Sequence, residues 1–351
     1  MFRVLPSHPH RRNEEIFSSW ILRIASGNGV SVRDLCDSID ETRNIQRLDL
    51  MWPNDPLVSS LAVATSMRAE LVGQALPASL QGLYGKGINE CWPYNRALPW
   101  HLRTGSPSPN VGGQYCIDCL RESRCYQLRW RISVYGCCLL HKNFLRECCP
   151  HCDEPIRDAS QFFNWRVPDP DREIELCGYC GGSLVRCEPS EFVTNDALEL
   201  AQIYDSLVRN PNCLGYFSVL YKLLQFMCGV SNLAKLMRSE ILADSRQLIL
   251  RCKDADMICF EVLDAKSRLT MLTTVLHLFK DWPVHFVDAV RSHSIRNWWI
   301  SGPNLPRWYL NAVELASTKR WNLMSCARQE FLSAATLEGW ASVGQFADRQ
   351  D

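Results

Sequence analysis

Four short cysteine and histidine pairs in the middle of the chain constrain its fold more than any other feature. They follow one another within 65 residues: Cys116 and Cys119, Cys138 and His141, Cys149 and Cys152, Cys177 and Cys180. Two residues separate the members of each pair, and this spacing lets one tight turn direct both side chains at the same ion. Two such turns complete a tetrahedron, so the pairs predict two closed zinc sites of the structural kind.

The spacing leaves open how the pairs combine. The gap between Cys119 and Cys138 is 18 residues, which suits one zinc site, whereas 24 residues separate Cys152 from Cys177 and predict a loop excursion over 153–176. Sequential sites would join the first two pairs and then the last two. A cross-braced arrangement, as in RING ubiquitin-ligase modules, would join the first pair with the third.

The compartment expected from the sequence favours metal binding over disulfides. The chain has 351 residues and 18 cysteines, its first residues contain no apolar signal core, and no stretch approaches the roughly 18 apolar residues of a membrane span. Thiols of a cytoplasmic protein are reduced, so a redox or disulfide role is the weaker alternative. Cys137 and Cys148 adjoin two ligand candidates, and we assign them no ligand role because only their neighbours give two-residue gaps.

Apolar residues at helical spacing on both sides of the cysteine-rich zone predict a mainly α protein. We expect an N-terminal helical domain over 1–105, a tandem zinc region over 106–188 that is a small α+β or loop-rich structure, and a C-terminal helical domain over 189–351. The first boundary lies in a stretch rich in Gly, Pro and Ser at 104–113. C-terminal helices are expected at 196–208, 214–228, 233–242 and 269–279, with another starting at 286.

The N-terminal domain begins with the outline of a helix-turn-helix. Ile16, Trp20 and Ile24 share one helical stripe, Gly and Asn break it at 27–29, and Ser31 with Asp34 predicts a capped second helix. A plain helical hairpin has the same outline and stays open as the alternative. A second helix pair is expected at 57–64 and 67–76, the latter capped by Ser66.

Charge and motifs exclude several classes of function. The 38 basic and 38 acidic residues cancel, so the chain does not coat nucleic acid by uniform charge. The sequence contains no P-loop, no HExxH, no GxSxG and no zinc-deaminase pattern, and we predict that it is not an enzyme. Two zones are candidate contacts for nucleic acid or a partner. The first is equally typical of a solvated zinc-site surface, and packing between the C-terminal helices is the favoured alternative for the second. The candidates are Arg121, Arg124, Arg129, Arg131, Lys142 and Arg146 in the first zone, and Arg291, Arg296, Trp298, Trp299, Arg307 and Trp308 in the second.

Several blocks together resemble the TniQ family. The segment from Glu15 to Gly29 is similar to the family's opening, an acidic residue followed by S-W-L-x-R-L-A-x-x-N-G. Leu98–Leu102, Tyr115–Glu122, Trp130–Arg131 and the later ligand pairs resemble further blocks of the family in the same order. The chain departs from the pattern at Ile117, where the family usually has Pro, and in the basic run from His8 to Arg12.

The resemblance implies a noncatalytic target-site selector of a DNA transposon. Such a protein would link a Cascade-like guide-RNA effector and its RNA at the target DNA to a TnsC-like AAA+ ATPase regulator, which recruits the transposase. A homodimer and a bacterial cytoplasmic, nucleoid-associated location are part of this expectation. The alternative within the family is a TnsD-like protein that reads an attachment site directly. Zero net charge favours the adaptor, because guide pairing then reads the sequence.

Overall fold

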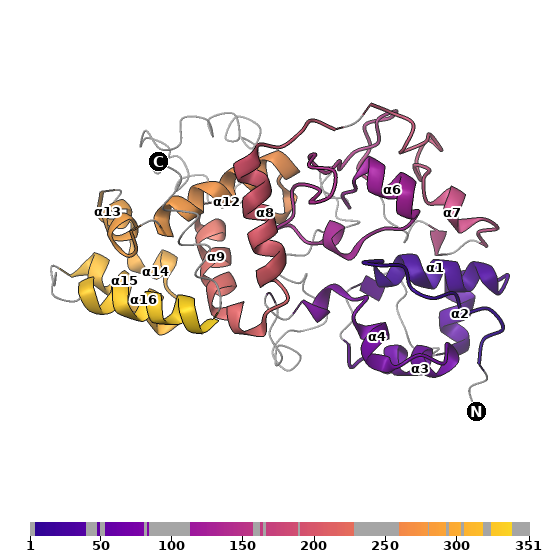
Figure 1. Cartoon of the computed structure of the whole chain (residues 1–351), viewed down its shortest axis with the longest axis horizontal. Coiled ribbons are helices and arrows are strands. Elements are labelled where there is room, and N and C mark those ends of the chain that lie inside the picture. Colours follow the sequence, from indigo (N-terminus) through magenta and orange to yellow (C-terminus); the bar gives the residue numbers. More distant parts are fainter. Residues whose placement is uncertain are drawn as a thin grey trace. The chain divides into compact units, whose positions relative to one another are not determined.

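The computed structural model in Figure 1 describes residues 4–39, 48–49, 53–80, 83, 113–156, 162–163, 166–188, 190–227, 260–279, 281–292, 295–302, 305–318 and 324–338. The chain forms two compact units. The first contains Met1–Ser79 and Gly87–Val193, and the second contains Leu80–Lys86 and Thr194–Asp351. Both units are mainly helical, as the sequence predicts.

The described part of the first unit contains four N-terminal α-helices and the cysteine-rich region. Its helical elements are α1 (Phe17–Gly27), α2 (Val32–Ile39), α3 (Pro56–Ala64), α4 (Ala69–Gly73), η2 (Pro77–Ser79), α6 (Ile117–Ser123), η4 (Leu128–Arg131) and α7 (Pro170–Glu173). The predicted capping box is present at α2, where the Asp34 amide donates to Ser31 Oγ over 3.1 Å and the Ser31 amide donates to Asp34 Oδ2 over 3.3 Å. Ser66 does not cap the next helix, because it lies in the left-handed region at φ 56° and the fourth helix begins only at Ala69, after Arg68.

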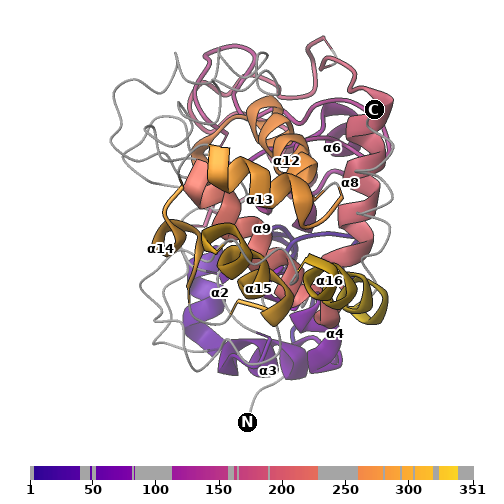
Figure 2. The same cartoon turned by 90° about the vertical axis from the view of Figure 1, so that its left-hand side faces the viewer.

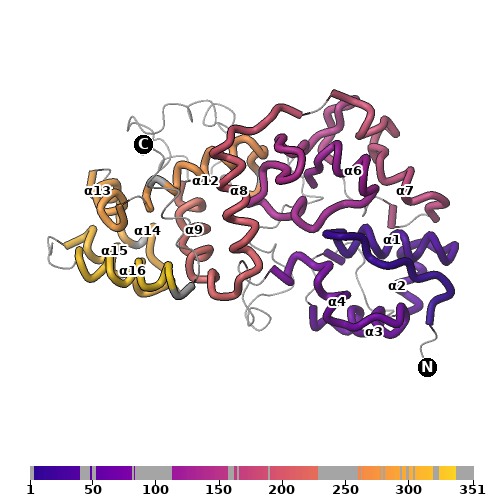
Figure 3. Tube along the Cα trace, in the orientation of Figure 1, coloured from indigo at the N-terminus to yellow at the C-terminus, as the bar shows by residue number. Residues whose placement is uncertain are grey.

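Helix α1 is the core of this unit, and residues from both its polar and apolar positions are buried. Its buried residues are Phe17, Ser18, Ser19, Trp20, Ile21, Leu22, Ile24 and Ala25. Its N-cap residue, Ile16, has no side chain that accepts a hydrogen bond. Three partners distant in sequence accept from its first amides instead: Ile16 donates to the Tyr126 carbonyl (2.9 Å), Phe17 to the Ala75 carbonyl (2.9 Å) and Ser18 to Asp49 Oδ1 (2.9 Å). The helix is thereby tied to the N-terminal helices on one side and to the cysteine-rich region on the other, between which it runs in Figure 3.

The cysteine-rich region is organised by turns rather than by a sheet. Its described residues form isolated antiparallel bridges only, among them Cys137 with Phe144, Cys148 with Pro155 and Leu176 with Ser183. A region with so little regular structure buries few backbone groups in ladders, so its order depends on the turns around the cysteine pairs.

The second unit is a helical assembly around an aromatic core. Its elements are α8 (Asn195–Leu207), η6 (Pro211–Cys213), α9 (Leu214–Met227), η8 (Phe260–Val262), α12 (Ala265–Phe279), α13 (Val284–Ser292), α14 (Asn297–Ile300), α15 (Arg307–Ser317) and α16 (Met324–Glu338). Figure 2 shows α12, α13, α15 and α16 gathered beside α9. Trp282 lies in the middle of this core, with ring centroids 5.3 Å from Trp308 and from Phe331 and 5.0 Å from Phe286.

The helices expected near 196–208, 214–228, 269–279 and 286 are confirmed as α8, α9, α12 and α13. The helix expected at 233–242 and the boundary stretch at 104–112 lie outside the described residues. The division into domains at 105 and 188 stays a prediction.

Candidate metal centres

The first candidate metal centre brings together the first two ligand pairs. Cys116 is the N-cap residue of α6 and Cys119 lies in its first turn, while Cys138 and His141 form a tight turn that faces them. The ligand atoms of all four residues lie within 4.8 Å of one another. The three cysteines are buried, and His141 directs Nδ1 at them, 3.2 Å from Cys119 Sγ and 3.5 Å from Cys116 Sγ.

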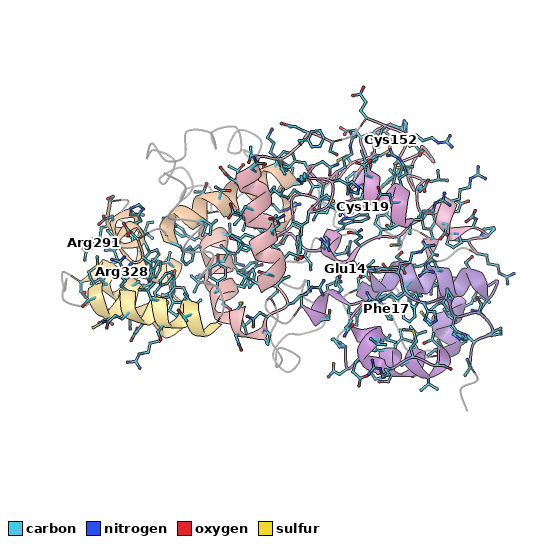
Figure 4. All side chains as sticks on the ribbon, viewed as in Figure 1. Glu14, Phe17, Cys119, Cys152, Arg291 and Arg328 are labelled. Carbon is cyan, nitrogen blue, oxygen red and sulfur yellow. The ribbon has the colours of Figure 1, made fainter. Side chains whose placement is uncertain are left out.

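The second candidate metal centre combines the last two pairs and is closer to solvent. Cys149, Cys152, Cys177 and Cys180 gather their sulfur atoms within 4.8 Å of one another. Cys149 and Cys177 are buried, Cys152 is half-buried and Cys180 is exposed. Figure 4 labels Cys119 and Cys152, one from each centre. The pairs therefore combine sequentially, and the cross-braced arrangement of a RING-like module is wrong for this chain.

Three of the four pairs share one backbone geometry. The amide of the first ligand donates to the carbonyl five residues later, at 2.8 Å for Cys138, 2.8 Å for Cys149 and 2.9 Å for Cys177. The residue after the second ligand turns the chain with a positive φ, namely Lys142 (55°), Asp153 (58°) and Gly181 (68°). Amides inside the turns also donate to the first sulfur over 3.4 Å, as His141 does to Cys138 and Tyr179 to Cys177. These bonds orient the ligand atoms and place positive dipole ends beside the sulfurs, which favours thiolate over thiol.

The distances fit a tetrahedral ion of zinc size. Metal–sulfur bonds of about 2.3 Å place the sulfur atoms of a tetrahedron about 3.8 Å apart. The observed separations are 3.5 Å between Cys119 and Cys138, 3.7 Å between Cys149 and Cys180, and 3.8 Å between Cys152 and Cys177. Both clusters can thus hold a metal ion, and a donor set of sulfur and imidazole is the one that structural zinc prefers.

A carboxylate lies beside His141, the histidine among the candidate ligands, on the ring nitrogen that faces away from the centre. His141 Nε2 lies 3.2 Å from Glu122 Oε1, on the last full turn of α6. A carboxylate in this place fixes the imidazole tautomer that leaves Nδ1 free to bind an ion, and it raises the basicity of the ligand. The sequence motifs gave no hint of this role for Glu122, because 19 residues separate it from its partner.

The neighbouring cysteines remain thiols. Burial raises the pKa of Cys137 to about 12 and that of Cys148 to about 11, so both stay protonated at neutral pH. In the first centre, hydrogen bonds from Cys116 and Cys119 lower the pKa of Cys138 to about 2. The contrast follows from the two positions, because Cys138 faces the other three ligand candidates whereas the adjacent Cys137 lies outside the cluster.

The predicted contact residues of the cysteine-rich region differ in accessibility. Arg131 is buried, Arg129 and Arg146 are half-buried, and Arg121, Arg124 and Lys142 are exposed. Arg146 donates to the Glu188 carbonyl and Arg121 to the Val185 carbonyl, so both also hold the backbone that follows the second centre. Arg131 is thus unavailable at this surface, and a contact role for the exposed residues stays a prediction.

The predicted contact residues of the second unit also differ in accessibility. Trp308 is 3% exposed inside the aromatic core, and packing between helices, the alternative we weighed for this zone, explains its position. Arg291 donates to the carbonyls of Leu315 and Thr318 at the C-terminal end of α15, where a cation is favourable to the helix dipole. Arg296 and Arg307 are exposed, and the side chains of Trp298 and Trp299 lie outside the described residues.

The first two helices do not present a typical DNA-reading surface. In a helix-turn-helix, the N-terminal end of the second helix contacts base edges. Here the Arg33 amide near that end of α2 donates to the Phe163 carbonyl over 3.0 Å. The exposed residues of α2 are Arg33, Asp34, Asp37 and Ser38, so the helix presents two acidic side chains and one basic side chain. The pair therefore resembles a helical hairpin within a packed unit.

Comparison with known proteins identifies the first part of the chain. A family model described as TniQ matches residues 6–145. This segment belongs to the TniQ family. No curated protein matches the chain. The TniQ segment includes the N-terminal helices and the whole first metal centre but ends before the second, and it implies a protein associated with transposition. Among the described residues, no helix is both long enough and apolar enough to span a membrane.

The structure also assigns roles to TniQ motif residues that the sequence left without one. Glu15 is fully buried and binds Ser19 and Arg23, while Trp20 Nε1 donates to the Pro9 carbonyl over 2.7 Å. The side-chain amide of Asn28 donates through Nδ2 to the Ser7 carbonyl over 2.6 Å. The basic run that departs from the family pattern is structural as well, since Arg12 binds Asp171 and the Arg124 carbonyl. These contacts hold the N-terminal segment against α1.

Proposed function

We propose that this chain is a noncatalytic adaptor in DNA transposition. It links a guide-RNA effector at the target, of the Cascade type, to an AAA+ ATPase regulator that recruits the transposase. The observation that carries the proposal is the TniQ match over residues 6–145 on a unit that holds two closed four-ligand centres. A closed ligand set leaves no open position for substrate, which supports a structural and recruiting role.

The α1–α2 pair favours an adaptor over a protein that reads a DNA site directly. A protein that reads DNA through this pair needs an accessible N-terminal end of α2 and a surface that phosphate tolerates. Instead, the Phe163 carbonyl accepts from the Arg33 amide at that end, and two carboxylates but only one guanidinium are exposed on the helix. An adaptor on a guide-RNA complex needs no base readout of its own, because base pairing supplies the sequence specificity.

We further propose that both centres hold zinc and that the ions are structural. Zinc, when bound, supplies cross-links that a region of isolated bridges lacks, and apparent binding energies of about 10–16 kcal/mol are available for folding. The chain's own residues orient the ligands through the turn amides described above. Two zinc ions per chain by elemental analysis of the purified protein would support this assignment.

Co-purification tests the adaptor function. The full chain is expressed with the AAA+ ATPase and the guide-RNA effector encoded beside it, and the product is sized by light scattering. Stable elution with the effector and its RNA, without target DNA, is the expected result, and the mass gives the copy number and tests the expected homodimer. A folded, zinc-loaded chain that elutes alone would contradict the proposal.

Matched variants separate a specific surface from general charge. Lys142→Glu changes an exposed position of the predicted patch, whereas Arg68→Glu changes an exposed position directly before α4 in the same unit. Loss of co-elution in the first variant only would identify the patch as the contact. If the wild type does not elute with the effector but shifts an attachment-site duplex with a steep salt dependence, direct DNA selection is the function instead.

A further inference from the structure

Asn143 is a buried polar residue beside the first metal centre that is not itself a ligand candidate. It is 2% exposed and follows shortly after the turn formed by Cys138 and His141. Its main-chain carbonyl accepts from the Cys138 amide over 2.8 Å, and this bond closes the turn. A buried side-chain amide is costly unless its polar atoms find partners, so the neighbours of this one indicate what it does.

The Asn143 side chain reaches the other ligand pair of the same centre. Its Oδ1 lies 3.4 Å from Cys116 Sγ, and its Nδ2 donates to Asp118 Oδ2 over 3.5 Å. The main chain of Asn143 thus holds a ligand candidate of the second pair, while its side chain contacts one of the first pair. A single residue therefore joins the two halves of the first centre, which are distant in sequence.

The equivalent positions of the other two turns do not bury a polar side chain. In these turns, too, a main-chain carbonyl accepts from the amide of the first ligand, over 2.8 Å at Glu154 and 2.9 Å at Gly182. Glu154 is exposed and Gly182 has no side chain. The shared turn geometry therefore requires no particular side chain at this position, and closure of the turn alone does not explain a buried asparagine at 143.

Metal binding decides which end of the amide faces Cys116. A cysteine that binds an ion has lost its proton, so its sulfur accepts hydrogen bonds and no longer donates one. A carbonyl oxygen repels such a sulfur, whereas an NH₂ group donates to it. The two ends of a side-chain amide have nearly the same shape, so a half-turn of the amide exchanges them without moving the residue. The Asp118 carboxylate then faces the amide oxygen, but it is partly exposed and also accepts from Arg121 over 2.8 Å.

We propose that Asn143 is a positioning residue of the first metal centre and donates from Nδ2 to the Cys116 thiolate when an ion is bound. The bond offsets part of the negative charge that three thiolates place around one ion, and it holds Cys116 beside the turn of the second pair. Loss of a partner of this kind typically weakens metal binding about 10–100-fold. The inference rests on the proposal that the first centre holds zinc, but not on the adaptor role.

Competition titrations of the full chain with a zinc chelator test the effect on affinity. Asn143→Leu keeps the size of the side chain but removes the donor, and should weaken one of the two zinc sites at least about tenfold. Glu154→Gln is the matched control at the equivalent position of the third pair, and both of its sites should bind as in the wild type. Normal binding by a folded Asn143→Leu chain overturns the proposal.

A variant of Asp118 distinguishes the two orientations of the amide. If Nδ2 donates to Cys116, the amide oxygen faces position 118, and Asp118→Asn supplies a donor there without weakening the first site. If Nδ2 instead serves Asp118, the same variant loses a charge-assisted bond and weakens the site as Asn143→Leu does, which overturns the proposal. A wild-type chain that binds no ion at the first centre overturns the zinc assignment as well, whereas the other negative results leave that assignment intact.

A measurement on the wild-type chain detects the bond itself. With an NMR-active cadmium isotope in place of zinc, a hydrogen bond from an amide to a ligand sulfur transmits scalar coupling between the amide proton and the metal. We expect this coupling at the side-chain amide of Asn143. The His141 amide, which donates to Cys138 Sγ over 3.4 Å, is the internal control. Coupling at His141 without coupling at the Asn143 side chain overturns the proposal, and coupling at Asn143 supports it even if Asn143→Leu fails to fold.

Discussion

Arg23 binds the carboxylate of Glu15 through two nitrogen atoms inside the first unit. Nε lies 2.9 Å from Oε1 and Nη2 lies 2.5 Å from Oε2, and the Glu15 side chain is completely buried. The same carboxylate accepts from Ser19 Oγ and from the Arg12 amide. One buried acid therefore joins α1 to the N-terminal segment, directly before the backbone that pairs with the cysteine-rich region.

Glu15→Gln should destabilise the first unit by about 3 kcal/mol, because removal of one partner leaves a poorly compensated buried charge on Arg23. Amides of α1 that exchange through unfolding of the unit should then exchange about a hundredfold faster. Glu70→Gln, at an exposed position of α4, is the control and should change the exchange less than threefold. Equal exchange rates in the two variants would contradict the role assigned to Glu15.

The capping box of α2 predicts a pH dependence. The hydroxyl of Ser31 donates to Asp34 Oδ2 over 2.8 Å, and this bond, followed by that from the Ser31 amide, lowers the pKa of Asp34. A lowered pKa in the folded state gives stability that is present above the ordinary carboxylate pKa and is lost as the pH falls through the folded value. Ser31→Ala should return the pKa of Asp34 toward its ordinary value in a carboxyl NMR titration, and an unchanged value would contradict the bond.

The ligand pairs and this capping box were predictable from the sequence because both are local. Two residues between ligands and three residues within a capping box specify a turn whatever surrounds it. Sequential pairing was not predictable, because both combinations use the same turns. In the structure, the first pair lies beside the second pair rather than the third. The length of chain between Cys119 and Cys138 permitted this pairing but did not require it.

Which elements pack against each face of a helix was not predictable either. The apolar stripe of α1 indicated one buried face, yet Ser18 and Ser19 are buried too. Asp49 accepts from the Ser18 amide, and the Tyr126 amide of the cysteine-rich region donates to Ser19 Oγ. Trp308 illustrates the same limit: basic neighbours in sequence suggested a surface, but helical spacing turns Trp308 into the core while Arg307 stays exposed. Periodicity assigns faces, and only tertiary packing decides which faces meet.

Chelation should remove the two ions in a fixed order. Cys180 is exposed and Cys152 half-buried, whereas all three cysteines of the first centre are buried, so a chelator reaches the second centre first. We expect two kinetic phases when the zinc-loaded chain is mixed with excess EDTA and a zinc indicator. The faster phase should be absent in Cys180→Ser. A single phase for both ions in the wild type would contradict the difference in access.

The left-handed turn residue of the last pair predicts a graded effect on metal affinity. Gly181 has φ 68°, a conformation that costs a residue with a Cβ roughly 1–2 kcal/mol. Gly181→Ala should therefore weaken zinc binding at the second centre about tenfold in a competition titration. Gly181→Asn should weaken it less, since Asn tolerates this region and Asp153 occupies the equivalent place after Cys152. Gly178→Ala, within the same turn but without a positive φ, is the control and should bind normally.

Adjacent residues of α15 allow stability and binding to be separated in the second unit. Trp308→Ala should cost about 3–5 kcal/mol, because it removes a ring that packs on Phe279, Trp282 and Phe331. Arg307→Ala should leave the thermal midpoint of the unit unchanged, because the side chain is exposed. If this zone also contacts a partner, only Arg307→Ala will weaken co-elution without lowering the melting temperature. If Trp308→Ala weakens co-elution without lowering the melting temperature, the ring contacts the partner directly. The conformation in which it packs in the core is then not the one that binds.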